Sequence, residues 1–380
     1  MKVLMVTPFP EDPTLVRGGV EAAASRLATA MWAHFGLEYD LLVYEASSGK
    51  LSYERWPHIN VLPIRPVRRG QRTPAHTIRR LVRQLERSRN YDVIHVQGPA
   101  SFVSRSPRQL VTIHGISERD SLYAARRMSQ KLRPKLVYLR EFIGRRRARN
   151  VIAISKYVIS VISHHNQRLW IIPNAVDPMF FSAVRKARAE RIVLFAGRVV
   201  EIKNVLGLIA AFEVAWTRDS RLRLRIVGNG LQTAYGQICL GRASGFPAGV
   251  VTFVGECDTP TLIDEMSQAK LLALFSWQEN APMVIAEAFA TGLPVVASGV
   301  GGVPEMVTNV NGELVEAGDE ISLAAAIERV ASWDLSVERT DAIRNSATHY
   351  RTESVARATY SAYEDICQTV SASIRYRENR

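Results

Sequence analysis

The chain has 380 residues, of which 47% are hydrophobic and 22% are charged, and these proportions exclude a disordered, collagen-like or coiled-coil protein. Its length predicts two domains of roughly 150–200 residues each. The three cysteines, Cys239, Cys257 and Cys367, form no Cys-x-x-Cys pair. This excludes a disulfide framework and a zinc ribbon, and it agrees with a reducing cytosol.

Positive charge is concentrated in one early part of the chain. The net charge is +13 at pH 7, and residues 50–150 alone contain 24 lysines and arginines against 6 aspartates and glutamates. The remainder is therefore slightly acidic. Such an asymmetry indicates a polyanionic partner.

No targeting or membrane-spanning segment is expected. The N-terminus has one lysine and an apolar run of only residues 3–6, which is too short for a signal peptide. No uncharged apolar run reaches about 18 residues, the length needed to span a bilayer. We expect a cytoplasmic protein, either soluble or peripheral on the inner face of the membrane.

The first half of the chain predicts alternating strands and helices. It opens with a buried-strand pattern at 3–6, followed by a loop rich in proline and glycine and by apolar residues at helical spacing over 20–31. Further strands are expected at 39–44, 93–96, 110–113, 151–154 and 170–172, and helices at 76–88 and 117–148. This alternation predicts a parallel sheet that is covered on both faces.

The second half predicts the same scheme. Strands are expected at 192–196, 222–227, 250–254, 271–275 and 295–297, and helices at 204–216, 283–291, 320–333, 338–347 and 353–372. We place the domain boundary near 173–188, where prolines precede a charged linker. Ligands of open parallel sheets bind at the carboxyl ends of the strands, so side chains that follow strands are the first candidates for a site.

Gly18 and Gly19 come directly before the first helix. Glycines there let a phosphate approach the backbone amides and the positive end of the helix. A plain glycine turn is the alternative interpretation.

Two cations, Arg198 and Lys203, lie between a strand end and the following helix. There they can clamp a diphosphate, the arginine in bidentate fashion and the lysine as a point charge. Both would offset the negative charge that develops on a departing diphosphate. The alternative is a pair of solvated surface cations.

The strongest signal is a pair of glutamates eight positions apart, Glu279 and Glu287. The first follows a strand, and the second falls within an apolar helix, where a carboxylate is costly without a partner. A carboxylate accepts hydrogen bonds from two vicinal hydroxyls, as on a ribose. A glutamate bound to backbone amides at a helix start is the alternative.

His114 follows the strand at 110–113 and can donate to a ligand hydroxyl or act as a base, although a structural histidine fits equally well. The glycines around 228 and 299 lack the third glycine of a dinucleotide fingerprint. The sequence has no P-loop, no Asp-x-Asp and no histidine cluster with metal-ligand spacing. We therefore expect neither a metal site nor a resident cofactor.

Taken in order, these motifs resemble family 4 of the retaining glycosyltransferases, and the resemblance covers nearly the whole chain. The residues that carry it are Gly18-Gly19, Thr112-Ile113-His114-Gly115, residues 151–155 and 172–177, Gly197-Arg198 with Lys203, residues 227–230 and 253–255, Glu279 with Glu287, and residues 292–297 and 301–305.

The resemblance implies a GT-B fold of two facing Rossmann-like domains, an interdomain cleft and a C-terminal helix that crosses back. An acceptor-binding domain would span 1–175, joined by the helix at about 355–380, and a nucleotide-sugar-binding domain would span 185–354. The co-substrate would be a nucleotide-diphosphate sugar. The activity would be retaining hexosyl transfer to a glycan or lipid-linked acceptor, in the synthesis of cell-surface polysaccharide or glycolipid.

The resemblance also implies roles for individual residues. Arg198 and Lys203 would hold the diphosphate and replace a metal, Glu287 would bind the ribose, and Glu279 and His114 would contact the donor sugar. The implied donor-binding set also contains Gly18, Gly19, Asn280, Ala281, Met283 and Val284. Family members often have Glu-Gly-Phe-Gly where this chain has Glu279 followed by Asn280, Ala281 and Pro282. Pro282 has no N–H, so one backbone donor to the sugar is absent.

The basic stretch then belongs to the acceptor-binding domain. Leu136, Leu139 and Ile143 recur at helical spacing among its cations, as in a helix that lies on an anionic leaflet. The candidate membrane or acceptor residues are Arg68, Arg69, Arg72, Arg79, Arg80, Arg83, Lys131, Arg133, Lys135, Arg140, Arg145, Arg146 and Arg147. A solvated charged face over a buried apolar stripe is the alternative.

Three other functions fit parts of the sequence. A nucleic-acid-binding protein agrees with the charge, but the arginine runs lack interleaved aromatic residues and no known module is present. A sugar-nucleotide epimerase or phosphorylase shares the implied fold, and an inactive scaffold of that fold is disfavoured because both glutamates and both cations are present.

Overall fold

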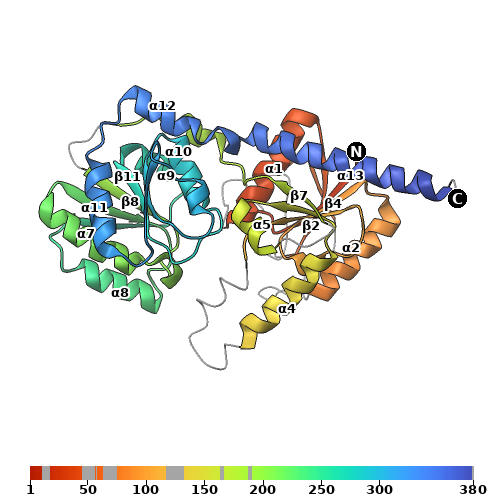
Figure 1. Cartoon of the computed structure of the whole chain (residues 1–380), viewed down its shortest axis with the longest axis horizontal. Coiled ribbons are helices and arrows are strands. Elements are labelled where there is room, and N and C mark those ends of the chain that lie inside the picture. Colours follow the sequence, from red (N-terminus) through yellow and green to blue (C-terminus); the bar gives the residue numbers. More distant parts are fainter. Residues whose placement is uncertain are drawn as a thin grey trace. The chain divides into compact units, whose positions relative to one another are not determined.

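A computed structural model describes residues 1–10, 18–44, 56, 58–62, 75–116, 132–162, 167–186 and 191–378. The chain divides into two compact units, Met1–Ala175 with Thr352–Arg380 and Val176–Arg351. Each unit is built on one parallel sheet with helices packed against it, so the expected α/β architecture is confirmed (Figure 1).

The first unit contains a seven-stranded sheet of order β3-β2-β1-β4-β5-β6-β7. The strands are β1 (Val3–Thr7), β2 (Tyr39–Val43), β3 (Ile59–Val61), β4 (Val93–Gln97), β5 (Gln109–Ile113), β6 (Asn150–Ala153) and β7 (Arg168–Ile171). Strand β3 was not predicted, because it has only three residues and none of them is buried.

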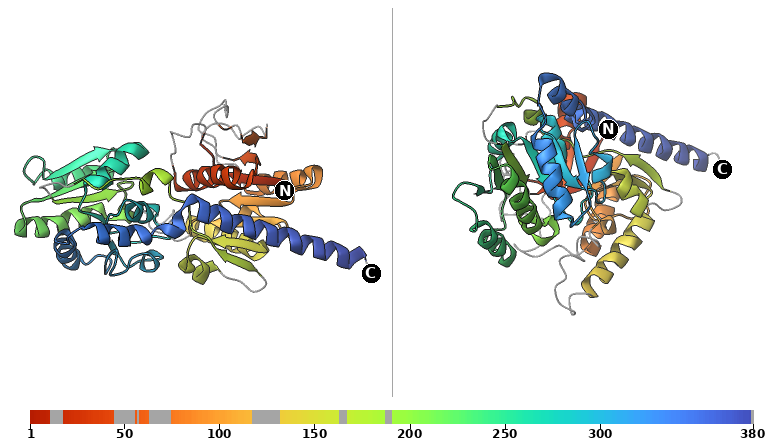
Figure 2. Two further views of the ribbon diagram at one scale, coloured as in Figure 1. Left: turned by 90° about the horizontal axis from the view of Figure 1, so that it is seen from above. Right: turned by 60° about the vertical axis from the view of Figure 1, so that its left-hand side comes forward.

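The helices of the first unit cover this sheet. They are α1 (Gly19–Phe35), α2 (Ala75–Arg89), the short η1 (Ala100–Phe102), α4 (Leu132–Arg147), α5 (Lys156–Ile162) and α13 (Thr352–Glu378). The long α13 runs beside α1, with Phe35 and Tyr360 stacked at 4.2 Å between ring centroids (Figures 1 and 2). The C-terminal helix therefore belongs to the same unit as the N-terminus, as the resemblance implies. Helix α5 was not predicted, and the part of the predicted helix at 117–131 lies outside the described residues.

A buried chain of hydrogen bonds ties α13 to the sheet. His95 on β4 lies 2.6 Å from Thr112 Oγ1 through Nε2 and 2.7 Å from Tyr363 OH through Nδ1. The Tyr363 hydroxyl in turn lies 3.1 Å from that of Tyr39 on β2. Buried polar groups are costly unless they are paired, so this chain favours one position of α13 on the sheet.

The second unit contains a six-stranded parallel sheet of order β10-β9-β8-β11-β12-β13. The strands are β8 (Arg191–Ala196), β9 (Leu222–Val227), β10 (Val251–Gly255), β11 (Leu271–Leu274), β12 (Val295–Ser298) and β13 (Gly312–Val315). Strand β13 was not predicted, because its Glu313 and Leu314 are not buried. The unit begins at Val176, earlier than the expected residue 185, because Val176 and Phe180 are buried in its core.

Helices lie on both faces of this second sheet (Figure 1). They are α6 (Pro178–Phe181), η3 (Glu201–Lys203), α7 (Val205–Arg218), α8 (Ala234–Ala243), α9 (Thr259–Gln268), α10 (Met283–Ala290), η4 (Val303–Glu305), α11 (Glu320–Ala331), α12 (Val337–Asn345) and η5 (Thr348–Tyr350). Among the longer of these, α8 and α9 were not predicted.

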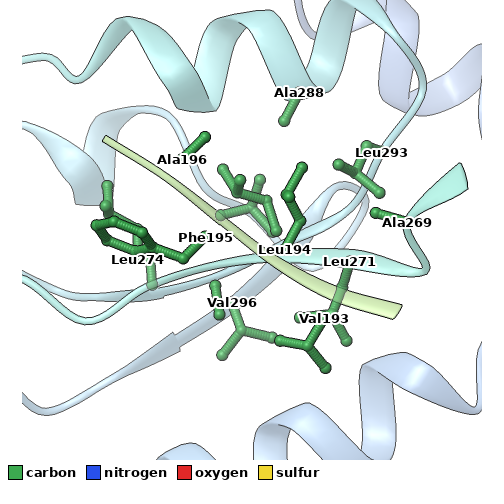
Figure 3. Close-up of a cluster of buried hydrophobic side chains, with 14 of the residues drawn as sticks. Val193, Leu194, Phe195, Ala196, Ala269, Leu271, Leu274, Ala288, Leu293 and Val296 are labelled. Atoms are coloured by element: carbon green, nitrogen blue, oxygen red, sulfur yellow. The ribbon is translucent and has the colours of Figure 1, made fainter. Parts of the chain in front are cut away.

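The core of the second unit is built around β8 and β11. Leu194 and Phe195 of β8 lie among Leu271, Leu274 and Ala288, all of them at most 1% exposed (Figure 3). Fully burying a leucine or phenylalanine side chain stabilises a protein by about 1.5–3 kcal/mol. The two central strands are thus firmly held, and the loops that leave their carboxyl ends start from fixed points.

Candidate functional site

The topology of the second sheet marks one edge as the place for a ligand. From β8 the chain proceeds through β9 to β10 on one side, and β11, β12 and β13 lie on the other side. In open parallel sheets ligands bind outside the carboxyl ends of the strands, where the strand order reverses. This reversal, called the switch point below, lies between β8 and β11. The loops that leave these two strands carry Arg198, Lys203 and Glu279.

Lys203 and Glu279 meet at this point. Lys203 Nζ lies 2.5 Å from Glu279 Oε1, and the Ser276 hydroxyl donates to the same oxygen at 2.7 Å. The side chains of Lys203 and Glu279 are 22% and 9% exposed, respectively. A carboxylate so buried is stable only when it is paired and hydrogen-bonded. The sequence indicated both charged residues but not their ion pair, and nothing marked Ser276.

The backbone on both sides of Lys203 is held in place by local hydrogen bonds. The short helix η3 ends at Lys203, and Asn204 follows in a left-handed conformation with φ of 48°. The Asn204 side chain caps α7 by accepting from the Gly207 N–H at 3.3 Å. Trp277 N–H also donates to the Ile202 carbonyl at 2.8 Å. The backbones of the two loops are thus joined beside the ion pair.

Two glycines let the loop after β9 approach the loop after β8. Val199 N–H donates to the Asn229 carbonyl at 2.8 Å. A side chain on Gly228 would collide with the Gly197 carbonyl, and one on Gly230 would come within 2.6 Å of Val199 O. Both glycines have positive φ, of 138° and 109°. They are needed for this close backbone approach.

Helix α10 begins where the loop after β11 ends. Its N-cap is Pro282, whose side chain makes no capping hydrogen bond. The Ile285 N–H donates to the Pro282 carbonyl at 3.1 Å, so the amides of Met283 and Val284 are the donors that the first turn can offer to a ligand. Glu287 is 9% exposed in the second half of this helix. The other predicted donor-binding residues of this region are Asn280 and Ala281 in the loop and Met283 and Val284 in the first turn.

Arg198 lies on the same edge of the sheet, in the loop after β8. Its side chain is exposed and makes no hydrogen bond or ion pair with the described residues. It is thus a cation that is available to a ligand beside the Lys203–Glu279 pair.

The remaining predicted site residues lie in the first unit. Gly18 and Gly19 are exposed at the start of α1, and a side chain on either would meet no atom within 4 Å, so packing does not explain these glycines. His114 follows β5, and its Nε2 lies 2.6 Å from Oε1 of Gln97 at the end of β4. Sequence reasoning missed Gln97, which carried no motif.

The basic residues are divided between exposed and buried positions. Arg80 and Arg83 of α2 and Arg140 and Arg146 of α4 are exposed, and Arg79 and Arg147 are partly exposed. Arg145 is only 5% exposed, so its expected place on the exposed surface is wrong. At the neighbouring Gly144 the backbone of α4 packs directly on that of η1, which leaves no room for a side chain and buries Arg145.

The structure does not describe the side chains of the other predicted membrane or acceptor residues. Arg68, Arg69, Arg72 and Lys131 lie outside the described residues, as do the side chains of Arg133 and Lys135 at the start of α4.

Apolar side chains of α4 point outward between these cations. Tyr138 and Leu139 are 51% and 52% exposed, and Ile143 is 38% exposed. Phe142 stacks on Tyr138, and the Arg146 guanidinium lies over its ring. The apolar stripe is therefore exposed at Leu139 and Ile143, contrary to the alternative of a buried stripe. No helix among the described residues is long and apolar enough to cross a membrane.

The described residues contain no group of three or more histidine, cysteine, aspartate or glutamate side chains arranged to hold a metal ion. The groups that can bind an anion at the switch point are instead Lys203, Arg198 and the amides of α10.

Two family models match the chain. One, described as Glycosyl transferases group 1, matches residues 190–332, and the other, described as Glycosyltransferase Family 4, matches residues 17–180. The chain is 36% identical over 182 residues to a D-inositol 3-phosphate glycosyltransferase of Streptomyces griseus, covering 45% of this chain and 38% of that protein. The matched part thus spans less than half of that relative.

Other matches extend over the full length. An uncharacterized glycosyltransferase of Methanocaldococcus jannaschii is 25% identical over 404 residues, covering 96% of this chain and 98% of that protein. The fold is similar to that of the Anabaena HepE protein, solved in complex with UDP and glucose, with a TM-score of 0.63 and 20% identity over 98% of this chain and 99% of that one.

Proposed function

Because the chain belongs to the family 4 type of glycosyltransferases with the GT-B fold, we propose that it transfers a hexose-type sugar from a nucleotide-diphosphate sugar to a glycan or lipid-linked acceptor. The transfer retains the anomeric configuration and serves the synthesis of cell-surface polysaccharide or glycolipid. The observation that carries the proposal is the Lys203–Glu279 ion pair at the switch point of the second sheet.

Arg198 and Lys203, the two cations at the carboxyl edge of the second sheet, hold the diphosphate. In the free protein Lys203 is neutralised by Glu279. A diphosphate carries more charge than one carboxylate and competes for the ammonium group, and Arg198 adds a second, exposed cation. Negative charge grows on the diphosphate as the sugar departs, so both cations bind the transition state more strongly than the ground state.

The glutamates bind the rest of the donor. Glu287 accepts hydrogen bonds from the ribose hydroxyls, and Glu279, once Lys203 turns to the diphosphate, accepts from hydroxyls of the sugar. The Asn280 amide replaces the backbone donor that Pro282 lacks. His114 keeps the role that the resemblance assigns to it, a contact with the donor sugar.

The acceptor is membrane-borne in this proposal. Exposed Tyr138, Leu139 and Ile143 on α4 lie among exposed cations. Helices of this composition lie in the plane of an anionic leaflet, where apolar side chains enter the interface and each basic residue contributes about 1 kcal/mol. The charged stretch would thereby hold the enzyme where a lipid-linked acceptor is found, at the cytosolic face.

An assay of nucleotide release tests the proposal. UDP-glucose is the first donor to try, since HepE was solved with UDP and glucose. We expect nucleoside diphosphate release that requires an acceptor and survives EDTA, because the charge is offset by Arg198 and Lys203. Lys203→Ala should lower kcat at least tenfold, and Lys186→Ala, at an exposed lysine of the same unit, should leave it unchanged.

Three outcomes would contradict the proposal. Loss of activity in EDTA that Mg²⁺ restores would overturn the metal-free site. Interconversion of nucleotide sugars without an acceptor would indicate an epimerase, and a product of inverted anomeric configuration would overturn retention.

A further inference from the structure

The imidazole of His114 lies between two carboxamides at the carboxyl edge of the first sheet. Gln97 ends β4, His114 follows β5, and Asn174 comes after β7. His114 Nε2 lies 2.6 Å from Gln97 Oε1. The Nδ1 atom is buried, and Asn174 lines the same small cavity.

The surroundings of the ring disfavour a positive charge. The cavity has a volume of about 20 Å³, enough for about one water molecule. Its lining contains no carboxylate and no lysine or arginine, and His95 is the other titratable group. Burial lowers the pKa of His114 to about 4, and Asn174 offsets this only in part. His95 has a pKa lowered to about 3 by burial and by the neighbouring His114, so it is neutral as well.

The contact with Gln97 selects one of the two neutral tautomers of the His114 ring. A neutral imidazole has one N–H group, and a carboxamide oxygen can only accept a hydrogen bond. With Oε1 as the partner, the N–H is on Nε2, and Nδ1 carries the lone pair. Gln97 is itself held, because Tyr44 OH donates to its backbone carbonyl at 3.2 Å and the residue is 2% exposed.

We propose that Gln97 is a positioning residue for His114, which it holds as a neutral ring with the proton on Nε2. His114 then contacts the sugar as an uncharged ring whose Nε2 proton is donated to Gln97, and it does not act as a general acid. A neutral imidazole has no acidic proton to give to a departing oxygen at neutral pH, so charge on the leaving diphosphate must be met elsewhere. The inference rests on the proposed sugar contact of His114.

Gln97→Glu tests this role, because it replaces the amide with a carboxylate of the same shape. An opposite charge at hydrogen-bond distance favours the imidazolium and raises its pKa. The ring signals of wild type and variant would be followed by NMR between pH 5 and 9 and assigned with His114→Asn. We expect no titration of His114 in the wild type in this range. In Gln97→Glu its midpoint should rise above pH 6. Gln84→Glu, at an exposed position on α2 of the same unit, should leave it unchanged.

Catalysis gives a second readout. In Gln97→Glu the kcat should follow the protonation of His114 and change at least tenfold across its midpoint. The wild type and the Gln97→Glu/His114→Asn double variant should lack this dependence. A purely structural Gln97 would lower kcat equally at every pH.

Several results would overturn the inference. Titration of His114 near pH 6.5 in the wild type would do so, and a variant serves there only to assign the ring signal. An unchanged midpoint in Gln97→Glu would do so too. If the ring titrates as expected but kcat stays independent of pH, the positioning role fails and the transferase activity stands. If the wild type transfers no sugar at all, the proposed function fails, and the NMR titration alone then decides the charge state of His114.

Discussion

At the scale of single residues, the Lys203–Glu279 pair is the feature that most constrains function. Glu279 is nearly as buried as a core residue, yet it is charged, and it is stabilised by one cation and one hydroxyl. Such pairs are weak contributors to stability relative to apolar residues of the same volume. A pair that adds little stability but lies at the ligand edge of the sheet indicates a role in binding.

Removing one partner of the Lys203–Glu279 pair should lower the stability of the protein, because the other charge is then buried without its partner. Lys203→Met leaves the Glu279 carboxylate with only the Ser276 hydroxyl, so we expect the free energy of unfolding to fall by about 1–3 kcal/mol. Adding Glu279→Leu should recover part of the loss, because the unpaired charge is then removed. Urea unfolding of both single variants and the double variant measures this coupling. Simple additivity of the two effects would argue against a coupled pair.

Charged site residues could be predicted from the sequence more readily than uncharged polar ones. Charged residues that follow strands were found because a charge close to the core is costly to bury, so its presence there indicates a binding role. Ser276 and Gln97 were missed, since polar uncharged residues are common. Ser276 precedes Glu279 by three positions but belongs to no motif, and only the fold brings Gln97 next to His114. Arg145 was misplaced because no sequence pattern indicates that the neighbouring glycine brings α4 against η1.

At the scale of elements, the strand-end loops of the second unit act as one framework. Backbone hydrogen bonds join the loop after β8 to the loops after β9 and β11. Strands β8 and β11 could be predicted from their apolar runs, and β9 from its alternation of apolar residues with arginines. Elements such as β13, with two of four residues unburied, could not, because their apolar pattern is interrupted.

A methyl group at Gly228 should disrupt this framework. It would collide with the Gly197 carbonyl in a conformation that other residues rarely adopt. We expect Gly228→Ala to cost more than about 1 kcal/mol of stability and to weaken nucleotide binding. Gly241→Ala is the control, since this glycine of α8 has open space around it, and alanine there should stabilise by about 0.5–1 kcal/mol. Thermal unfolding compares the two, and equal effects would refute the close-approach argument.

Helix α4 allows a separate prediction. Leu139→Asn with Ile143→Asn removes apolar surface that is already exposed, so folding should be little affected, while recovery with anionic vesicles should fall about fivefold or more. Ile321→Asn, at a residue 65% exposed in the second unit, is the control. Equal recovery of the wild type with neutral and anionic vesicles at low salt would contradict membrane binding.

At the scale of the whole molecule, the excess of basic residues and the charged residues of the proposed diphosphate and ribose contacts lie in different units. The basic excess falls in residues 50–150 of the first unit, and the Lys203–Glu279 pair and Glu287 fall in the second. The α/β class, and the return of α13 to the first unit, could be anticipated from periodicity and from the resemblance. The boundary between Ala175 and Val176 lies within the expected range of 173–188, whereas the burial of Val176 and Phe180 in the second core could not be anticipated, because it is a tertiary effect.

The most direct test of the donor site is a calorimetric titration with UDP, GDP, ADP and dTDP. We expect that one of these nucleotides binds, that Glu287→Ala weakens it at least tenfold through loss of the ribose contact, and that Glu213→Ala, at an exposed carboxylate of the same unit, binds as the wild type does. Binding of none of the four, or equal binding by Glu287→Ala and the wild type, would contradict a nucleotide-sugar site at the switch point of the second sheet.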